Sequence, residues 1–334
     1  MKFKIFLAFL LLASFLQAKD TNNKANLEPK RVVVADGMLP IPALILFLTN
    51  AKFDYIPEAS KSAFVNSIVS DFYPEIKSVK AGENDNFEEL IAMNANLYIC
   101  HKDGIKLCET LKKAELNVLP LSIRGGKFNS KNTLKYWLDE LSKEFPIKEK
   151  AESIIADISK TEQENVAILK SVKPVRAMMM TIYQGKVVVG AFGDYLLKNS
   201  GGVDVFKGVW EKGGGGVVNF EEIYAQDPEV IYITNFSPVM PENLLKAREW
   251  QGVAAIKNKR VYKLPLATYR PYAPNLDLAV LLKFLASKNH PELFKDLDIK
   301  AEYKKHFKKF YNLDLSNAQA ERIMHPSRAA GDVK

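Results

Sequence analysis

Tyrosine, arginine and histidine side chains follow predicted β-strands in both halves of the chain, and together they could bind an anion or a metal complex. An arginine fork pairs with carboxylate, phosphate or catecholate oxygens. A tyrosine phenolate is a hard donor that suits Fe(III), and histidine suits several transition metals. Ligands of open α/β sheets bind beyond the carboxyl ends of the strands. The candidate ligand-binding residues are therefore those in the loops after the strands: Asp36, Met38, Tyr55, His101, Arg124, Tyr183, Phe192, Asn235, Tyr269, Arg270 and Tyr272.

Two places in this set are the strongest candidates. Arg124 follows an apolar strand and precedes two glycines, and the run from Tyr269 to Tyr272 combines aromatic rings with Arg270. A loop ion pair for Arg124 and loop packing for the aromatic run remain open alternatives. The candidate metal ligands are His101 and Tyr269. A single histidine cannot hold a bare ion, but it can complete a metal centre that already carries an organic chelator.

The remaining sequence features favour binding over catalysis. We find no Ser-His-Asp, His-Glu-x-x-His or Cys-x-x-Cys pattern, and Gly213–Gly216 lacks the Lys-Ser/Thr of a phosphate loop. His290, His306 and His325 fall in the C-terminal helices or tail and are expected to be solvated. We therefore predict a protein that is not an enzyme and has no intrinsic cofactor.

An internal repeat indicates how these residues are positioned. Asn-Phe-Glu-Glu occurs at Asn86 and again at Asn219, and each copy reads as a capped helix followed by an apolar strand. The two glutamates of each copy stand in the positive first turn of the helix. A motif that occurs once in each half predicts two similar α/β lobes, with a ligand cleft between them.

Strands and helices alternate on both sides of one long segment, which is typical of βαβ units around a mostly parallel sheet. The long segment, residues 147–171, contains no Gly or Pro. Its apolar positions predict one helical face formed by Ile147, Ala151, Ile154, Ile155, Ile158, Val166 and Leu169. The sequence thus predicts two Rossmann-like lobes joined by a single interdomain helix.

The N-terminus indicates an exported protein, and the overall charge gives no sign of a nucleic-acid partner. Two lysines, an apolar core of about a dozen residues and Ala18 form a signal peptide over residues 1–18, too short for a transmembrane helix, which needs about 20 residues. The net charge of +8 comes from scattered lysines, so we expect no nucleic-acid binding. Cys100 and Cys108 could pair in an oxidising compartment, but spacing alone leaves this open.

Several motifs, taken together and in order, resemble the substrate-binding proteins of iron-siderophore, haem and cobalamin ABC importers. They are the stretch from Asn219 to Ile231, Leu197-Lys-Asn-Ser-Gly-Gly202, the stretch from Trp250 to Tyr262, and Phe310-Tyr-Asn-Leu-Asp-Leu-Ser316. The resemblance covers roughly residues 30 to 318. It implies an N-terminal lobe at 30–146, a connecting helix at 147–172, a C-terminal lobe at 173–318 and a tail at 319–334.

The resemblance also implies partners. We expect a periplasmic monomer, cleaved near Ala18 and without stable membrane insertion, that captures a metal chelate such as a ferric siderophore and delivers it to an inner-membrane ABC permease. In this family one glutamate at the start of the matching helix in each lobe docks on the permease, which implies Glu88 and Glu221 here. Related siderophore binders keep a tyrosine near the position of Tyr269. Some pair it with a C-lobe histidine, which this sequence lacks, and that puts a His–Tyr iron site in doubt.

The identity of the cargo stays open at this point. Haem would favour Tyr269 or His101 as an axial ligand, and an oxyanion such as molybdate or tungstate would favour arginine and backbone donors. Cobalamin or a nickel complex are further alternatives, although nickel would need more histidine. A periplasmic metal chaperone or enzyme on the same fold would need a closed metal set or a nucleophile–base pair.

Overall fold

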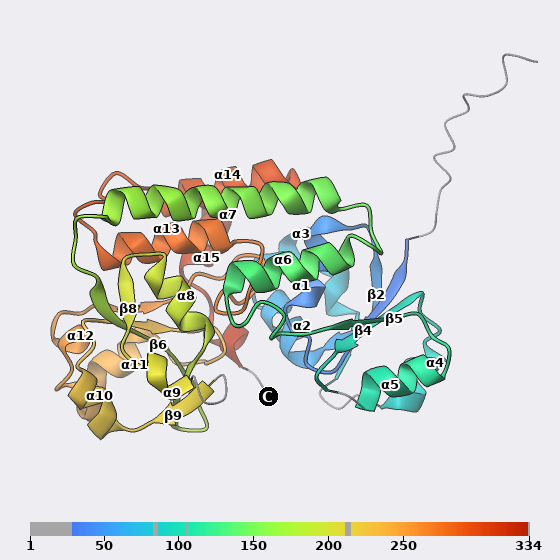
Figure 1. Ribbon diagram of the computed structural model, residues 1–334, viewed down its shortest axis with the longest axis horizontal. Helices are drawn as coiled ribbons and strands as arrows, with labels where there is room; N and C mark the ends of the chain where they lie inside the picture. The colour runs from blue at the N-terminus through green and yellow to red at the C-terminus, as the bar shows by residue number, and fades with distance from the viewer. Residues whose placement is uncertain (1–28, 83–85, 105, 211–214, 333–334) are drawn as a thin grey trace, which may run out of the picture.

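The chain forms two α/β lobes bridged by one long helix, as the sequence predicts (Figure 1). The computed structural model describes residues 29–82, 86–104, 106–210 and 215–332. The predicted signal peptide and the first two glycines of Gly213–Gly216 lie outside these ranges. No helix of the described part is long and apolar enough to cross a membrane.

The N-terminal lobe is built on a five-stranded parallel sheet in the order β3-β2-β1-β4-β5. Its strands are β1 (Arg31–Val34), β2 (Lys52–Pro57), β3 (Lys80–Gly82), β4 (Leu97–His101) and β5 (Val118–Leu121). Its helices are α1 (Ile41–Leu48), α2 (Glu58–Val65), α3 (Val69–Phe72), the 3₁₀ turn η1 (Pro74–Lys77), α4 (Phe87–Ala92), α5 (Lys106–Lys113) and α6 (Ser130–Leu141). Every residue of α1 is buried, because this helix lies between the sheet and the C-terminal helices.

The C-terminal lobe has a mixed sheet in the order β11-β10-β6-β7-β9, with β8 paired to the start of β6. Its strands are β6 (Val175–Tyr183), β7 (Lys186–Gly190), β8 (Gly202–Asp204), β9 (Gly215–Val218), β10 (Val230–Ile233) and β11 (Val261–Lys263). The antiparallel pairs are β6 with β7 and β7 with β9. The β6–β7 hairpin places β7, and the chain that follows it, beside the cleft between the two lobes.

The helices of the C-terminal lobe divide into two groups. Those inserted between its strands are α8 (Phe192–Lys198), α9 (Lys207–Trp210), α10 (Phe220–Gln226), α11 (Pro241–Lys246), the 3₁₀ turn η2 (Arg248–Trp250) and α12 (Ala254–Lys257). Those after the last strand are α13 (Leu278–Asn289), α14 (Ile299–Tyr311), α15 (Asn317–Met324) and the 3₁₀ turn η3 (Arg328–Gly331). The second group reaches the N-terminal lobe: Phe47 of α1 has its ring centroid 5.9 Å from that of Phe307 in α14.

The connecting helix α7 (Lys148–Leu169) runs along the top of both lobes in Figure 1 and packs against α6 and α13, which both lie below it in that view. The predicted buried face is correct in its first half, where Ala151, Ile154 and Ile158 are buried. It is wrong in the second half: Val166 is 62% exposed, while Thr161 and Asn165 are buried. The buried positions keep a helical spacing of three and four residues, and the Asn165 side chain donates to Asn199 O over 2.9 Å.

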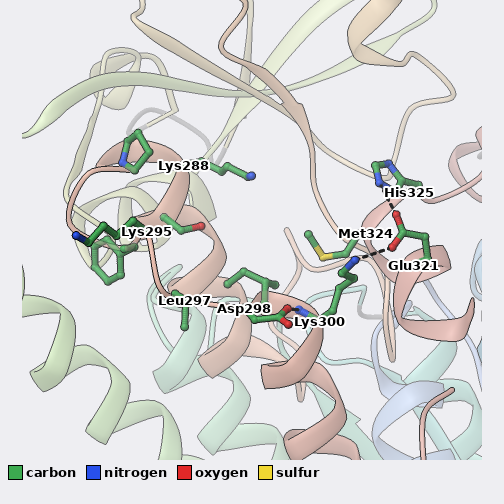
Figure 2. A pocket seen from close by; sticks show the side chains of 12 residues that line it. Lys288, Lys295, Leu297, Asp298, Lys300, Glu321, Met324 and His325 are labelled. Carbon is green, nitrogen blue, oxygen red and sulfur yellow. Dashed lines mark hydrogen bonds and ion pairs between the residues drawn. The ribbon is translucent and has the colours of Figure 1, made fainter. Parts of the chain in front are cut away.

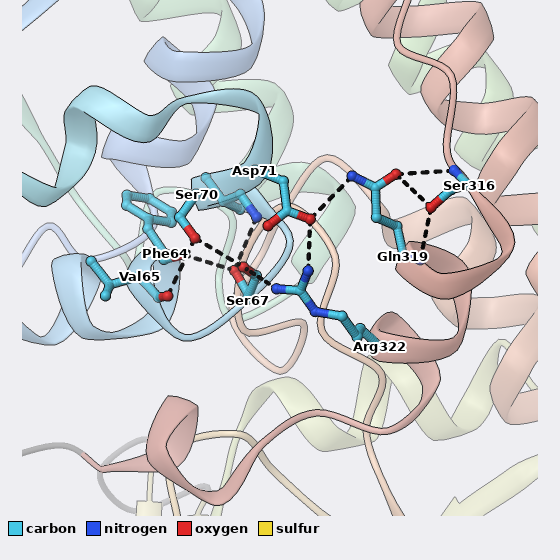
Figure 3. Close-up of polar contacts among 9 residues, drawn as sticks. Phe64, Val65, Ser67, Ser70, Asp71, Ser316, Gln319 and Arg322 are labelled. Carbon is cyan, nitrogen blue, oxygen red and sulfur yellow. Dashed lines mark hydrogen bonds and ion pairs between the residues drawn. The ribbon is translucent and has the colours of Figure 1, made fainter.

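Residues 316–332, which we call the C-terminal strap, fold back onto the N-terminal lobe (Figure 3). Arg322 in α15 forms an ion pair with Asp71 of 2.6 Å and donates to Ser67 O over 3.0 Å. Gln319 donates to the same Asp71 carboxylate over 3.1 Å. The segment assigned to a tail is therefore a second connection between the lobes, in addition to α7.

Cys100 and Cys108 form a disulfide, with their Cα atoms 5.7 Å apart. The bond ties α5 to the end of β4, within a small core that includes Val33 and Leu111. Closing a loop of this length restricts the unfolded chain.

We expect Cys100→Ser with Cys108→Ser to lower the free energy of unfolding by about 2–3 kcal/mol, the value for a loop of this size. Urea denaturation followed by circular dichroism measures this difference. The oxidised wild type treated with a reductant serves as the control and should match the variant. A variant as stable as the oxidised wild type would contradict the expectation.

The expectation that the C-terminal histidines are solvated is wrong for two of the three. His290 and His306 are 5% and 4% exposed. The His290 ring nitrogen lies 2.9 Å from Gly201 O, and His306 packs on Phe310 at 4.8 Å between ring centroids. Burial lowers the pKa of His306 to about 4. These histidines belong to the interface between the C-terminal helices and the rest of the lobe.

Candidate functional site

A cavity of about 270 Å³, which we call the apolar chamber, lies between the lobes. Its lining is mostly aliphatic or aromatic and comes from both lobes: Ile123, Phe128, Met179, Met180, Thr181, Val188, Val189, Gly190, Phe192, Gly215, Thr234 and Tyr272. Only Ile123 and Phe128 belong to the N-terminal lobe. The chamber adjoins the last residues of β6 and β10, where the sheet rule places a ligand.

Phe192 and Tyr272 are the predicted site residues that the chamber contains. Their rings meet edge to face, with centroids 6.2 Å apart. Burial, and then the nearby Asp204 carboxylate, raises the pKa of Tyr272, so its phenol stays neutral. The Thr181 and Thr234 hydroxyls, 2.6 Å apart, form a hydrogen bond with each other in the same lining.

Phe128 is a site residue that the sequence analysis missed. It follows β5 in a tight segment where Lys127 and Phe128 both have left-handed φ angles, 52° and 59°. Gly126 makes this path achievable, because a Cβ atom there would lie 2.2 Å from Thr133 N. The path brings the Phe128 ring across the cleft to Phe192, with centroids 5.9 Å apart. The two glycines at 125 and 126 were the only sequence signal for it.

A second cavity of about 430 Å³, which we call the polar chamber, adjoins the first under α7. Its lining comes from α6, α7, α8 and the residues next to α6 and α8: Lys127, Phe128, Asn129, Lys131, Asn132, Glu162, Ala191, Asp194, Tyr195, Lys198 and Asn199. Glu162 accepts a hydrogen bond of 2.7 Å from the Tyr195 hydroxyl and forms an ion pair with Lys131. Burial and this hydrogen bond raise the pKa of Tyr195. Phe128 lines both chambers.

Arg270 and Tyr269 lie outside both chambers. The Arg270 side chain is fully buried, with its nitrogens donating to Ala330 O in the strap and to Ala59 O in α2. The Tyr269 ring packs between Phe64 and Phe236, with centroids 5.9 and 6.3 Å away. Burial raises the pKa of Tyr269, which disfavours the phenolate that Fe(III) would require.

The other predicted residues divide by exposure. Met38, Tyr55 and Asn235 are at most 3% exposed and belong to the packed interior. Arg124 is exposed directly after Ile123, and within the described ranges its side chain makes no hydrogen bond or ion pair. Ile123 lines the apolar chamber, whereas Arg124 does not.

The remaining three lie at turns. Tyr183 is 49% exposed at the β6–β7 turn. Asp36 has a left-handed φ of 54° after β1. His101 ends β4, and its Nδ1 accepts from Asp103 N over 3.1 Å. None of the three lines either chamber.

Two further observations concern metals and other cavities. The described residues contain no group of three or more His, Cys, Asp or Glu side chains arranged to hold a metal ion.

A hollow of about 510 Å³ lies away from the cleft, between α13, α14 and α15 (Figure 2). Its rim carries Glu321, which pairs with Lys300 at 3.0 Å and His325 at 3.1 Å. The hollow takes no residue from the N-terminal lobe, so it is separate from the inter-lobe site.

In each copy of the Asn-Phe-Glu-Glu repeat, the two glutamates make different contacts. Asn86 and Asn219 cap α4 and α10 as predicted, each accepting from the backbone three residues on. Glu89 pairs with Lys80, and Glu222 closes a capping box. Within the described ranges, the exposed Glu88 and Glu221 make no side-chain hydrogen bond or ion pair. In Figure 1, α4 and α10 lie near opposite ends of the molecule, on the side away from α7.

The fold has counterparts among known proteins. The family model described as periplasmic binding protein matches residues 54–268. The molybdate-binding protein MolA of Haemophilus influenzae is 21% identical over 258 residues, which is 71% of this chain and 73% of that protein.

Solved structures show the same fold. A periplasmic solute binding protein of Veillonella parvula has a TM-score of 0.74 and 22% identity, covering 89% of this chain and 92% of its own. CeuE of Helicobacter pylori with Ni(II) bound has a TM-score of 0.71 and 24% identity, covering 89% and 95%. The family model spans more than half of the chain, and the two lobes with their linking helix agree with it. The chain therefore belongs to the periplasmic binding protein family, the non-enzymatic solute-capturing components of ABC transporters.

Proposed function

We propose that this protein captures a metal chelate, of the ferric siderophore type, between its lobes and delivers it to an inner-membrane ABC permease. The apolar chamber is the observation that carries the proposal, because both lobes contribute to it and its lining is mainly aliphatic and aromatic. Small-molecule sites are typically apolar with a few placed polar groups. The organic shell of a chelate suits such a lining better than a bare ion does.

An oxyanion cargo is less well supported by the arrangement of donors. A desolvated oxyanion needs converging N–H groups or guanidinium forks. Arg270 directs its donors to two backbone carbonyls, and Arg124 is exposed. MolA binds molybdate and CeuE was solved with Ni(II), so relatives of similar fold take different cargo. Molybdate and nickel complexes therefore stay in the test below.

In this proposal the chelator holds the metal, and the protein contacts the chelator. Phe128, Phe192 and Tyr272 supply aromatic surface, and the exposed Arg124, next in sequence to the lining residue Ile123, supplies a cation. Export to the periplasm agrees with the Cys100–Cys108 disulfide, because such bonds persist in oxidising compartments. Glu88 and Glu221 are the proposed docking points for the permease.

We expect the mature protein to bind a ferric catecholate more tightly than haem, cobalamin, nickel–histidine or molybdate. Trp137 is a suitable fluorescent reporter, since its indole donates to Ser122 O over 2.9 Å beside the chamber-lining Ile123. Phe192→Ala and Tyr272→Ala should each weaken binding by about 10-fold, the cost of one lost aromatic contact.

Tyr224→Ala is the matched control, because Tyr224 lies on the surface of α10 away from both chambers. It should leave the affinity unchanged. Failure to bind any of the five ligands, or full affinity in both chamber variants, would overturn the proposed site.

A further inference from the structure

Phe128 separates two chambers whose chemistry is opposite. The apolar chamber of about 270 Å³ holds rings and aliphatic side chains, and the polar chamber of about 430 Å³ holds charges. On the facing wall, the run Gly190-Ala191-Phe192 passes from one to the other. Ligand sites usually measure about 300–1,000 Å³. The apolar chamber alone falls below this range, and both chambers together fall within it.

The Phe128 ring is held in the cleft by weak contacts and an unfavourable backbone. Left-handed φ angles at two successive non-glycine residues, Lys127 and Phe128, are rare because Cβ crowds the following carbonyl. The ring contact that spans the cleft is an edge-to-face pair with Phe192 at an interplanar angle of 76°. Strained backbone of this kind clusters at ligand clamps and switch regions, and movement of the segment would release the strain.

The polar chamber carries positive charge that its own carboxylates do not neutralise. Glu162 is paired with Lys131, and Asp194 with Lys207 at 3.1 Å. Lys198 and Lys127 line the same chamber and make no ion pair or side-chain hydrogen bond within the described ranges. The amino terminus of the twelve-residue helix α6 also lies in this lining and adds a favourable dipole for an anion.

We infer that the two chambers form one bipartite site, gated by Phe128, for a metal chelate that carries a free carboxylate arm. The inference rests on the proposed function and narrows its ligand class. The apolar chamber holds the aromatic shell of the chelate, and the arm enters the polar chamber between Lys127 and Lys198. Phe128 swings out of the cleft to join the chambers when the ligand enters.

Two matched probes test the carboxylate arm: a ferric catecholate chelate with one free carboxylate and its methyl ester. We expect wild type to bind the carboxylate form at least about 10-fold more tightly, as one charge-assisted contact provides. Lys127→Gln with Lys198→Gln should abolish this difference and leave the affinity for the ester unchanged. Lys170→Gln, at the exposed end of α7, is the matched control and should change neither affinity.

The gate has its own readout in stopped-flow association. Phe128→Ala should raise the association rate constant of both probes several-fold, because no ring has to leave the cleft. An unchanged or lower rate would overturn the gate. Equal affinity of wild type for acid and ester would overturn the carboxylate arm while the proposed function stands. Binding of neither probe would overturn this inference, and failure to bind all five ligands named above as well would overturn the proposed function with it.

Discussion

Arg270→Ala is expected to lower the free energy of unfolding by about 3–5 kcal/mol, the cost of removing one member of a buried polar network. The guanidinium is fully buried and donates to Ala330 O over 3.1 and 2.8 Å and to Ala59 O over 2.8 Å. The Arg270 Cζ atom also lies 5.0 Å from the Phe236 ring centroid. Alanine would remove the guanidinium donors from both carbonyls and leave a cavity where three parts of the chain meet.

Thermal unfolding followed by circular dichroism measures this effect, and a fall in Tm of roughly 5–15 °C corresponds to it. Arg328→Ala is the matched control. Arg328 stands in the same C-terminal strap, but its side chain is 58% exposed, and exposed pairs contribute about 0–1 kcal/mol. A change for Arg270→Ala as small as that for Arg328→Ala would contradict the structural role of the buried guanidinium.

Local patterns in the sequence were enough to predict the lobes. The caps at Asn86 and Asn219, the alternation of strands and helices and the unbroken segment before Lys170 all depend on neighbours within a few residues. Such signals are visible without tertiary contacts. They predicted both repeat helices, the two sheets and the connecting helix.

The site depended on contacts between distant residues, which local patterns do not carry. Arg270 was predicted as a ligand because it follows a strand, but the strap residue Ala330, sixty positions later, accepts its hydrogen bonds. Phe128 enters the cleft only because Lys127 and Phe128 adopt left-handed angles, which their residue types do not favour. Phe192 and Tyr272, two of the predicted ligand-binding residues, line the apolar chamber, and their role in ligand binding stays a prediction.

The double variant Glu88→Gln with Glu221→Gln is expected to reduce stimulation of the cognate permease by roughly 100-fold or more at limiting binding-protein concentration. Each carboxylate that meets an arginine fork contributes about 1.5–3 kcal/mol, and each 1.4 kcal/mol is tenfold in affinity. Both side chains are exposed, make no ion pair within the described ranges and stand on helices at opposite ends of one side of the molecule. Docking points so far apart on a rigid body set the register of the complex.

The measurement is ligand-dependent ATPase activity of the permease in proteoliposomes, as a function of binding-protein concentration. Each single variant should shift the half-maximal concentration about tenfold or more, and ligand affinity should not change, because neither residue lines a chamber. Glu164→Gln removes the same charge from α7 on the opposite side and should behave as wild type. Loss of stimulation in Glu164→Gln, or full stimulation by the double variant, would place the docking surface elsewhere. High salt should lower the stimulation of the permease by wild type toward the level of the double variant. The reason is that exposed charges are screened within about 8 Å at 0.15 M, and more strongly at higher salt.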